Sequence, residues 1–158
     1  PQTINGFAQI DASSPILTYA ENLLIIAESQ LRLNGFDNGL SALNNYRSFL
    51  NSLFPNSYQP LNETDFQTGG VENNDNLNPT DALLKEILEE KYIMLFGTTE
   101  VFSDIRRTLS DVNSKVNLTP NTGSELPQRF LYPQSEIDRN SNAPNPIPGF
   151  FEPTQINK

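Results

Sequence analysis

The sequence predicts a mainly α-helical fold with long irregular loops and an extended C-terminal tail rich in Pro and Asn. Three observations lead to this prediction. Two stretches repeat their apolar residues every three or four positions, which is the spacing of one face of an α-helix. Polar segments rich in Asn, Pro, Ser and Thr separate and follow these stretches. Seven prolines between positions 120 and 153 exclude a long helix from the end of the chain.

A first helix is expected over residues 15–33. Ser14 and Pro15 supply an N-cap and a first helical residue, and Asn34-Gly35 supplies a stop signal. The apolar stripe of this helix consists of Ile16, Ala20, Leu23, Leu24, Ala27 and Leu31.

A second helix is expected over residues 39–53, after a turn at 36–39. It should stop before Pro55, because proline disfavours a helical conformation in the residue before it. With the first helix it should form an antiparallel pair over 15–53. Its apolar stripe consists of Leu40, Leu43, Tyr46, Leu50 and Leu53.

Residues 54–79 are expected to form a loop, since the apolar periodicity is lost among prolines, glycines, asparagines and acidic residues. Loops this long inside compact domains are usually functional or disordered. Composition alone therefore makes this segment the most interesting part of the surface.

Two further helices are expected over residues 79–109. Asn78 and Pro79 provide the N-cap and first residue of a strong helix, which keeps Phe96 on its apolar side and ends at Gly97. A shorter helix then starts at about residue 99. It should turn inward Val101, Phe102, Ile105 and Leu109, and carry at its margins Glu100, Asp104, Arg106 and Arg107.

The tail over residues 110–158 should be largely irregular. It still contains apolar anchors at 130–132 and 150–151, so we expect it to wrap over the helices in an extended conformation. Three arginines could bind an anionic ligand through their forked donors, but pairing with acidic neighbours is the favoured alternative. That pairing would tie the tail onto the third and fourth helices through Arg106, Arg107 and Arg129.

Composition excludes several kinds of chemistry. The chain has no Cys and no His, which removes disulfides, thiolate nucleophiles, Cys-based zinc sites and every triad that depends on His. Its net charge of −9 opposes binding to nucleic acid. No apolar run approaches the roughly 20 residues that cross a bilayer. The start at Pro1, without a signal segment, predicts a processed or excised piece of a longer protein.

Carboxylates remain as acid–base groups, yet no catalytic pair and no metal site is expected. Glu89 and Glu90 are neighbours on a helix, so their side chains point about 100° apart and favour ion pairing over joint catalysis. Glu72 and Asp75 lie among asparagines, as calcium ligands often do, but the spacing of an EF-hand loop is missing. A solvated loop is the simpler interpretation.

The loop over 54–79 also contains the residue types of a sugar site. Aromatic rings can stack on the C–H face of a sugar, and amides can bond its hydroxyl groups. An alternative, favoured for the phenylalanine, is that the aromatic residues anchor the loop to the helix pair. The ligand-binding candidates are Tyr58, Phe66, Asn73 and Asn74.

Five segments taken in order resemble the C-terminal part of SusD/RagB-like outer-membrane proteins. They are Pro-Ile-Leu-Thr-Tyr-Ala-Glu-Asn-Leu-Leu-Ile-Ile-Ala-Glu-Ser at 15–29, Ala-Leu-Asn-Asn-Tyr-Arg at 42–47, Ile-Leu-Glu-Glu-Lys-Tyr-Ile-Met-Leu-Phe-Gly at 87–97, Glu-Val-Phe-Ser-Asp-Ile-Arg-Arg-Thr at 100–108, and Leu-Pro-Gln-Arg-Phe-Leu-Tyr-Pro-Gln-Ser-Glu-Ile at 126–137. Together with Asn140 they cover about residues 15–142, nearly the whole chain, and the resemblance implies that residues 1–158 are a C-terminal fragment of a SusD-like domain.

The resemblance implies a fold of tetratricopeptide-like helix pairs, of which 15–53 would be one, with Ala42 and Tyr46 at the four-residue step of the second helix. It also implies a non-catalytic lipoprotein without a cofactor, exposed on the outer membrane and lipid-anchored outside this fragment. Such a protein captures an oligosaccharide or other glycan for a SusC-like TonB-dependent transporter. A tetratricopeptide-like module that binds a peptide or partner protein is the alternative function.

Overall fold

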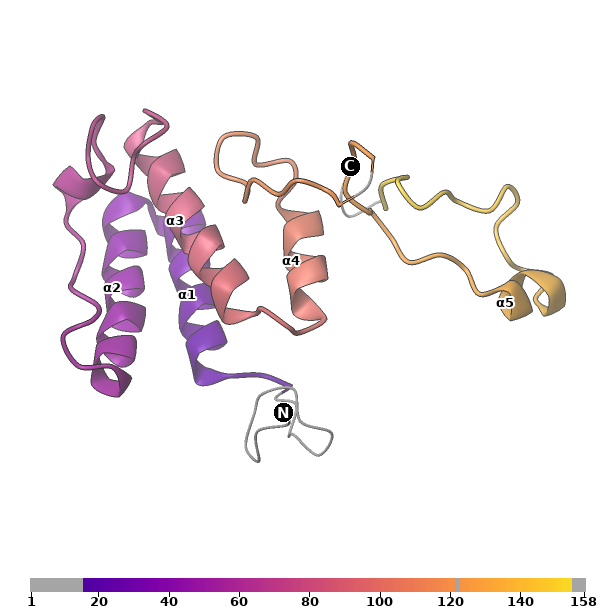
Figure 1. Cartoon of the computed structure of the whole chain (residues 1–158), viewed down its shortest axis with the longest axis horizontal. Coiled ribbons are helices and arrows are strands. Elements are labelled where there is room, and N and C mark those ends of the chain that lie inside the picture. Colours follow the sequence, from indigo (N-terminus) through magenta and orange to yellow (C-terminus); the bar gives the residue numbers. More distant parts are fainter. Residues whose placement is uncertain (1–15, 122, 155–158) are drawn as a thin grey trace. The chain divides into compact units, whose positions relative to one another are not determined.

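The computed structural model describes residues 16–121 and 123–154, and it is mainly helical (Figure 1). These residues contain five α-helices and one short 3-10 helix, and no strand is found among them. The predicted α-helical class is therefore confirmed. The chain divides after Leu61 into two compact units, which are described in turn. None of the helices within the described ranges is long and apolar enough to cross a membrane.

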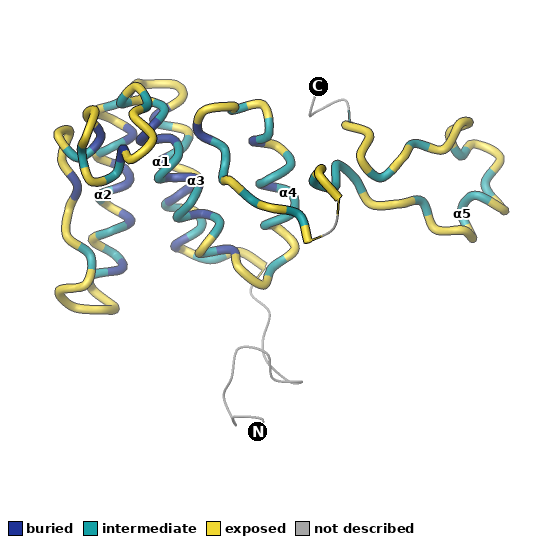
Figure 2. Tube along the Cα trace, turned by 45° about the horizontal axis from the view of Figure 1, so that its top comes forward, coloured by how far each residue is buried: buried dark blue, intermediate teal, exposed yellow. Residues whose placement is uncertain are grey.

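The first unit is built on a hairpin of two helices, α1 (Tyr19–Asn34) and α2 (Phe36–Leu53), which lie side by side in Figure 1. Most of the predicted apolar stripes supply its core, since every third or fourth residue is buried, as Figure 2 shows along both helices. This confirms the helix pair, although its tetratricopeptide-like character stays a prediction. Leu53, predicted in the second stripe, is 55% exposed at the end of α2, so that part of the prediction was wrong. The buried side chains are Ala20, Leu24, Ala27 and Leu31 in α1 and Ala42, Leu43, Tyr46 and Leu50 in α2.

Helix α1 begins four residues later than the sequence indicated. Its N-cap is Thr18, whose hydroxyl oxygen accepts a hydrogen bond from the Glu21 N–H at 3.1 Å, while the Glu21 carboxylate accepts one from the Thr18 N–H at 3.3 Å. This reciprocal capping box satisfies two amide groups at the helix start. The predicted signals Ser14 and Pro15 lie outside the described residues, and Ile16, expected in the apolar stripe, is 97% exposed.

The turn expected at 36–39 is instead the first turn of α2, and Gly35 alone connects the two helices. Gly35 has a positive φ of 86°, a conformation that side chains disfavour, so one residue can reverse the chain. Gly39 then lets the helices approach closely, because a Cβ atom there would lie 2.6 Å from Leu31 Cβ.

The first part of the predicted loop is fixed along α2. Asn44 donates to the Leu61 carbonyl at 2.9 Å and accepts from the Leu61 N–H at 2.8 Å, so its side chain acts like a strand partner for Leu61. Arg47 Nε donates to the Gln59 carbonyl at 2.8 Å. Residues 54–61 are therefore a strap held by hydrogen bonds.

The second unit contains η1 (Glu63–Phe66), α3 (Pro79–Met94), α4 (Glu100–Arg107) and α5 (Gln134–Arg139). Helix α3 begins as predicted, with Asn78 accepting from the Asp81 N–H at 3.0 Å and with Pro79 as its first residue. It ends at Met94. Phe96, predicted on the apolar side, lies beyond the helix end and is 70% exposed, so that prediction was wrong.

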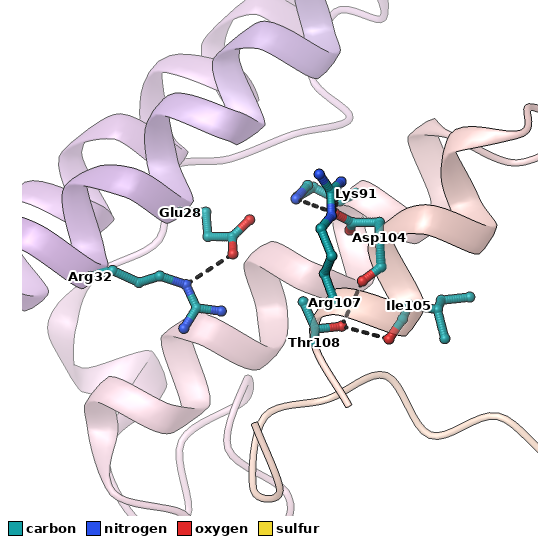
Figure 3. Close-up of polar contacts among 7 residues, drawn as sticks. All are labelled: Glu28, Arg32, Lys91, Asp104, Ile105, Arg107 and Thr108. Atoms are coloured by element: carbon teal, nitrogen blue, oxygen red, sulfur yellow. Dashed lines mark hydrogen bonds and ion pairs between the residues drawn. The ribbon is translucent and has the colours of Figure 1, made fainter. Parts of the chain in front are cut away.

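A buried ion pair joins α3 to α4. Lys91 Nζ lies 2.7 Å from Asp104 Oδ1, and Arg107 Nη2 lies 3.3 Å from the same oxygen (Figure 3). Thr108 donates its hydroxyl to the Asp104 carbonyl at 3.0 Å and closes the end of α4. Asp104 was predicted at the helix margin, but it is buried because the amine from α3 compensates its charge.

The tail after α4 is mostly irregular, and the short helix α5 buries no residue. Of the three arginines, Arg106 bonds from α4 to the tail, with Nη1 3.3 Å from the Gln128 carbonyl oxygen. Arg107 pairs within α4, and Arg129 bonds to tail carbonyl groups. The expectation that arginines tie the tail to the helices therefore holds for Arg106, while wrapping of the whole tail over the helices stays a prediction.

Candidate functional site

Phe66 is a core residue, which corrects its selection as a ligand-binding candidate. Its side chain is fully buried, with a relative exposure of 0%, in the short helix η1 that packs against α3. Burial of a phenylalanine removes a large apolar area from water, so the ring stabilises the fold. A sugar at the surface cannot stack on this ring. The structure supports an anchoring role with α3 as the partner of η1, while the expected anchoring to the helix pair stays a prediction.

Asn73 is likewise a structural residue. Its amide nitrogen donates to the carbonyl oxygens of Phe66 and Leu77, each at 2.8 Å, and its amide oxygen accepts from the Leu77 N–H at 2.8 Å. The side chain is 2% exposed. Both of its donor hydrogens are thus used within the loop, and none is left for the hydroxyl group of a ligand.

Tyr58 and Asn74 are accessible, but they belong to different units. Tyr58 is half-buried in the first unit, beside the Phe54 ring at 6.5 Å and the Arg47 guanidinium at 6.0 Å. Asn74 is exposed in the second unit, with one long contact of 3.5 Å to the Val71 carbonyl. The four candidates therefore do not form one described site, and two of them have structural duties.

Asn74 also lines a small polar niche, in which the amine of Lys85 pairs with the acidic side chains. Lys85 pairs with Asp75 and lies 3.7 Å from Glu89, and the Asp75 hydrogen bond raises the pKa of Lys85 although partial burial opposes this. The niche has a volume of about 60 Å³, far below the ~300 Å³ at which ligand pockets begin. Within the described ranges, no group of three or more acidic side chains could hold a metal.

A hollow larger than the niche lies in the tail of the second unit, and sequence reasoning missed it. It consists of two adjoining cavities of about 410 and 340 Å³, each within the range of ligand pockets. We call it the tail groove and define it by the residues that line both cavities: Leu118, Thr119, Pro120, Glu125, Leu126 and Phe151.

Contacts between distant parts of the tail build the groove. The Gln128 N–H donates to the Phe150 carbonyl at 3.0 Å, which joins two segments far apart in the sequence. Arg129 donates to the carbonyl oxygens of Glu152 at 2.8 Å and Pro153 at 2.9 Å, so the same two segments are joined twice. On the α4 side, the Phe102 and Phe130 rings meet with centroids 4.7 Å apart.

The lining of the groove combines apolar and polar side chains. The larger cavity is also lined by Lys115, Asn117, Ser124 and Gln128, and the smaller one by Tyr92 and Phe150. The only sequence signal for this site was the aromatic content of the tail, which was interpreted as anchoring. The hydrogen bond between the backbones of residues 128 and 150 depends on tertiary structure, so no local sequence pattern predicts it.

No protein-family model, curated protein or solved structure matches this chain. Function is therefore inferred from the residues of the tail groove and from the contacts between the segments that carry the sequence resemblance. The groove combines aromatic, amide, hydroxyl and charged side chains, which is the chemistry of a site for a polar organic ligand.

Proposed function

We propose that this chain is a non-catalytic, glycan-binding component of an outer-membrane uptake system of the SusC/SusD type. In this role it captures oligosaccharide and presents it to a SusC-like TonB-dependent transporter. It acts at the cell surface, where a lipid anchor outside these residues holds the protein. The ligand is bound and released unchanged.

One observation carries this proposal: three of the five segments that resemble SusD-like proteins contact one another. Lys91 in the segment 87–97 pairs with Asp104 in the segment 100–108 at 2.7 Å. Arg106 in 100–108 bonds to Gln128 in 126–137. Residues that carry the resemblance therefore also join α3, α4 and the tail, and a fold shared with SusD-like proteins would keep these segments in contact.

The tail groove supports binding rather than hydrolysis. Glycoside hydrolysis generally requires two carboxyl groups about 5–10 Å apart across the scissile bond. Glu125 is the sole carboxylate among the described residues that line the groove. Aromatic surface and neutral hydrogen-bonding groups, by contrast, are what a sugar needs for reversible capture.

Affinity electrophoresis tests the proposal directly. The chain is run through native gels that contain soluble plant, host or microbial polysaccharides, beside a gel without polysaccharide. Retardation by at least one polymer, with no reducing sugar released during incubation, is the expected result. Free migration through every gel would contradict glycan capture, and release of reducing sugar would contradict a non-catalytic role.

A second candidate function, a tetratricopeptide-like module that binds a partner protein, is favoured by an apolar stripe on α1. Tyr19, Ile26 and Leu33 follow one another at seven-residue steps and are 62%, 42% and 80% exposed. Stacked helix pairs normally cover such a face with a neighbour. This alternative predicts indifference to polysaccharides, together with loss of partner binding in Leu33→Glu without a change in the melting temperature.

A further inference from the structure

We infer that the tail groove is the glycan site of this chain and that its ligand is an uncharged oligosaccharide lying across Phe151. The inference rests on the proposed function and adds to it the place, the charge and the extended form of the ligand. No residue of the groove was among the candidates from the sequence.

The dimensions of the groove favour a chain of sugars over a single ring. The two cavities of about 410 and 340 Å³ adjoin, and the residues that line both of them, 118–120, 125–126 and Phe151, form their shared wall. A ligand that fills both must pass along this shared wall. Two sugar units of an oligosaccharide can occupy the two cavities, and the unit between them can lie over the shared wall.

Phe151 provides the apolar platform on that wall. Its side chain is 47% exposed, and it meets Phe150 in a T-shaped contact with ring centroids 5.2 Å apart. The contact restrains one aromatic residue against the other, while about half of Phe151 stays accessible. A restrained and accessible ring suits stacking on the C–H face of a sugar, since little conformational freedom is lost on binding.

The polar groups of the groove match hydroxyl groups and balance each other in charge. Lys115 donates hydrogen bonds, Glu125 accepts them, and Asn117 and Thr119 can do both. One cation and one anion leave the groove without net charge, whereas the chain as a whole carries −9. A uronic-acid or sulfated glycan would therefore gain little at the site and be repelled by the molecule.

The groove is also braced before any ligand arrives. The bond from Gln128 to Phe150 and the two bonds from Arg129 hold together the segments on which its walls lie. Arg106 connects Gln128 to α4. Bracing of this kind lowers the entropy cost of binding, because the walls do not have to be ordered by the ligand.

The experiment compares the whole chain with variants of the shared wall. Xylan, pullulan and galactomannan serve as uncharged probes in affinity gels, and heparin and alginate serve as anionic ones. Affinity is then measured by calorimetry with the hexasaccharide of the polymer that retards the chain. The variants are Phe151→Leu, which removes the ring, Phe151→Tyr, which keeps it, and Glu125→Gln. The matched control is Phe96→Leu, at an exposed ring outside the groove.

We expect Phe151→Leu to weaken binding by about fivefold to tenfold, as loss of one aromatic contact predicts. Glu125→Gln should weaken it by about threefold or more, because a charged acceptor becomes a neutral one. Phe151→Tyr and Phe96→Leu should bind like the unaltered chain. Circular dichroism melts show that each variant is folded.

Three results would overturn the inference in distinguishable ways. If the chain binds an uncharged glycan and neither Phe151→Leu nor Glu125→Gln weakens it, the site lies elsewhere and the proposed function stands. If only heparin or alginate retards the chain, the ligand is anionic and the charge argument is wrong. If no polysaccharide retards it, the groove assignment and the proposed function fall together.

Discussion

The loop over residues 62–78 and the tail after α4 are both largely irregular and rich in Asn, yet they use their polar side chains differently. In the loop, Asn73 donates both of its amide hydrogens to backbone carbonyl groups, and Phe66 is buried in the core. In the tail, Asn113 and Ser114 donate to Asp81 in α3. Around the groove, however, the Gln128 backbone and Arg129 make the long-range bonds, and the groove is lined by other side chains, Lys115, Asn117, Thr119 and Glu125. A segment with the composition of a binding site therefore becomes one only where its hydrogen-bonding capacity is not consumed by the fold.

The largest expected effect separates the two phenylalanines. Phe66→Ala should lower the free energy of unfolding by about 4 kcal/mol, because it opens a cavity at a fully buried position. Phe151→Ala should change that free energy by less than about 1.5 kcal/mol, since its ring is 47% exposed. Urea denaturation followed by circular dichroism measures both. Equal destabilisation by the two variants would contradict the assignment of Phe66 to the core and of Phe151 to an accessible surface.

The second largest loss of stability is expected at the buried ion pair between Lys91 and Asp104. Lys91→Met should cost about 3 kcal/mol of unfolding free energy, because it leaves Asp104 buried without its closest cation. Arg107, 3.3 Å from the same oxygen, keeps the cost from being larger.

The matched control for that variant is an ion pair on the helix surface. Arg32 Nε and Glu28 Oε1 lie 2.9 Å apart in α1 (Figure 3). The Arg32 side chain is 37% exposed, so Arg32→Met should cost less than about 1 kcal/mol. A comparable cost for the two substitutions in urea denaturation would show that burial does not set the strength of the Lys91 pair.

Two neighbouring asparagines provide a sharper comparison within the loop. Asn73→Ala should lower the free energy of unfolding by about 2 kcal/mol, because two carbonyl groups and one N–H lose their partners. Asn74→Ala, at an exposed position, should change it by less than about 0.5 kcal/mol. Neither substitution should weaken retardation by polysaccharide while the protein is folded. A loss of retardation in folded Asn74→Ala would return the ligand site to the loop.

The smallest expected effect concerns Lys85 in the polar niche. Its pKa lies above the ordinary value of 10.5 in the folded chain because it bonds to Asp75. Since the folded state holds this proton more tightly, the stabilisation is fully present below pH 10.5 and is lost as pH rises through the folded pKa. Lys85→Gln should therefore be slightly less stable than the unaltered chain at pH 7 and equal to it at strongly alkaline pH. A pH-independent difference in urea denaturation would contradict this assignment.

The helices were predictable from the sequence, because apolar spacing and capping residues act locally. Where prediction failed, two local signals competed or a distant partner decided. The capping box of Thr18 and Glu21 defines the observed start of α1, and Gly35 alone connects the helices. Asp104 appeared to belong on a solvated margin, because its partner Lys91 is on another helix. Only the Asp104 case depended on a partner outside its own stretch of sequence.

The sequence predicted the types of residue that line the candidate site, but it did not predict where in the chain the site lies. Aromatic and amide residues were sought in the long loop, where their density is high, and the groove lies in the tail. The reason is physical: whether an amide binds a ligand or the backbone depends on the carbonyl groups that the fold brings within reach. For Asn73 these are the carbonyl groups of Phe66 and Leu77.

The most direct test of this account is the mobility of the unaltered chain and Phe151→Leu, side by side, in a native gel containing an uncharged polysaccharide that binds. We predict that the unaltered chain is retarded and that Phe151→Leu, folded by circular dichroism, migrates nearly as in a gel without polysaccharide. Equal retardation of the two proteins would contradict the assignment of glycan capture to the tail groove.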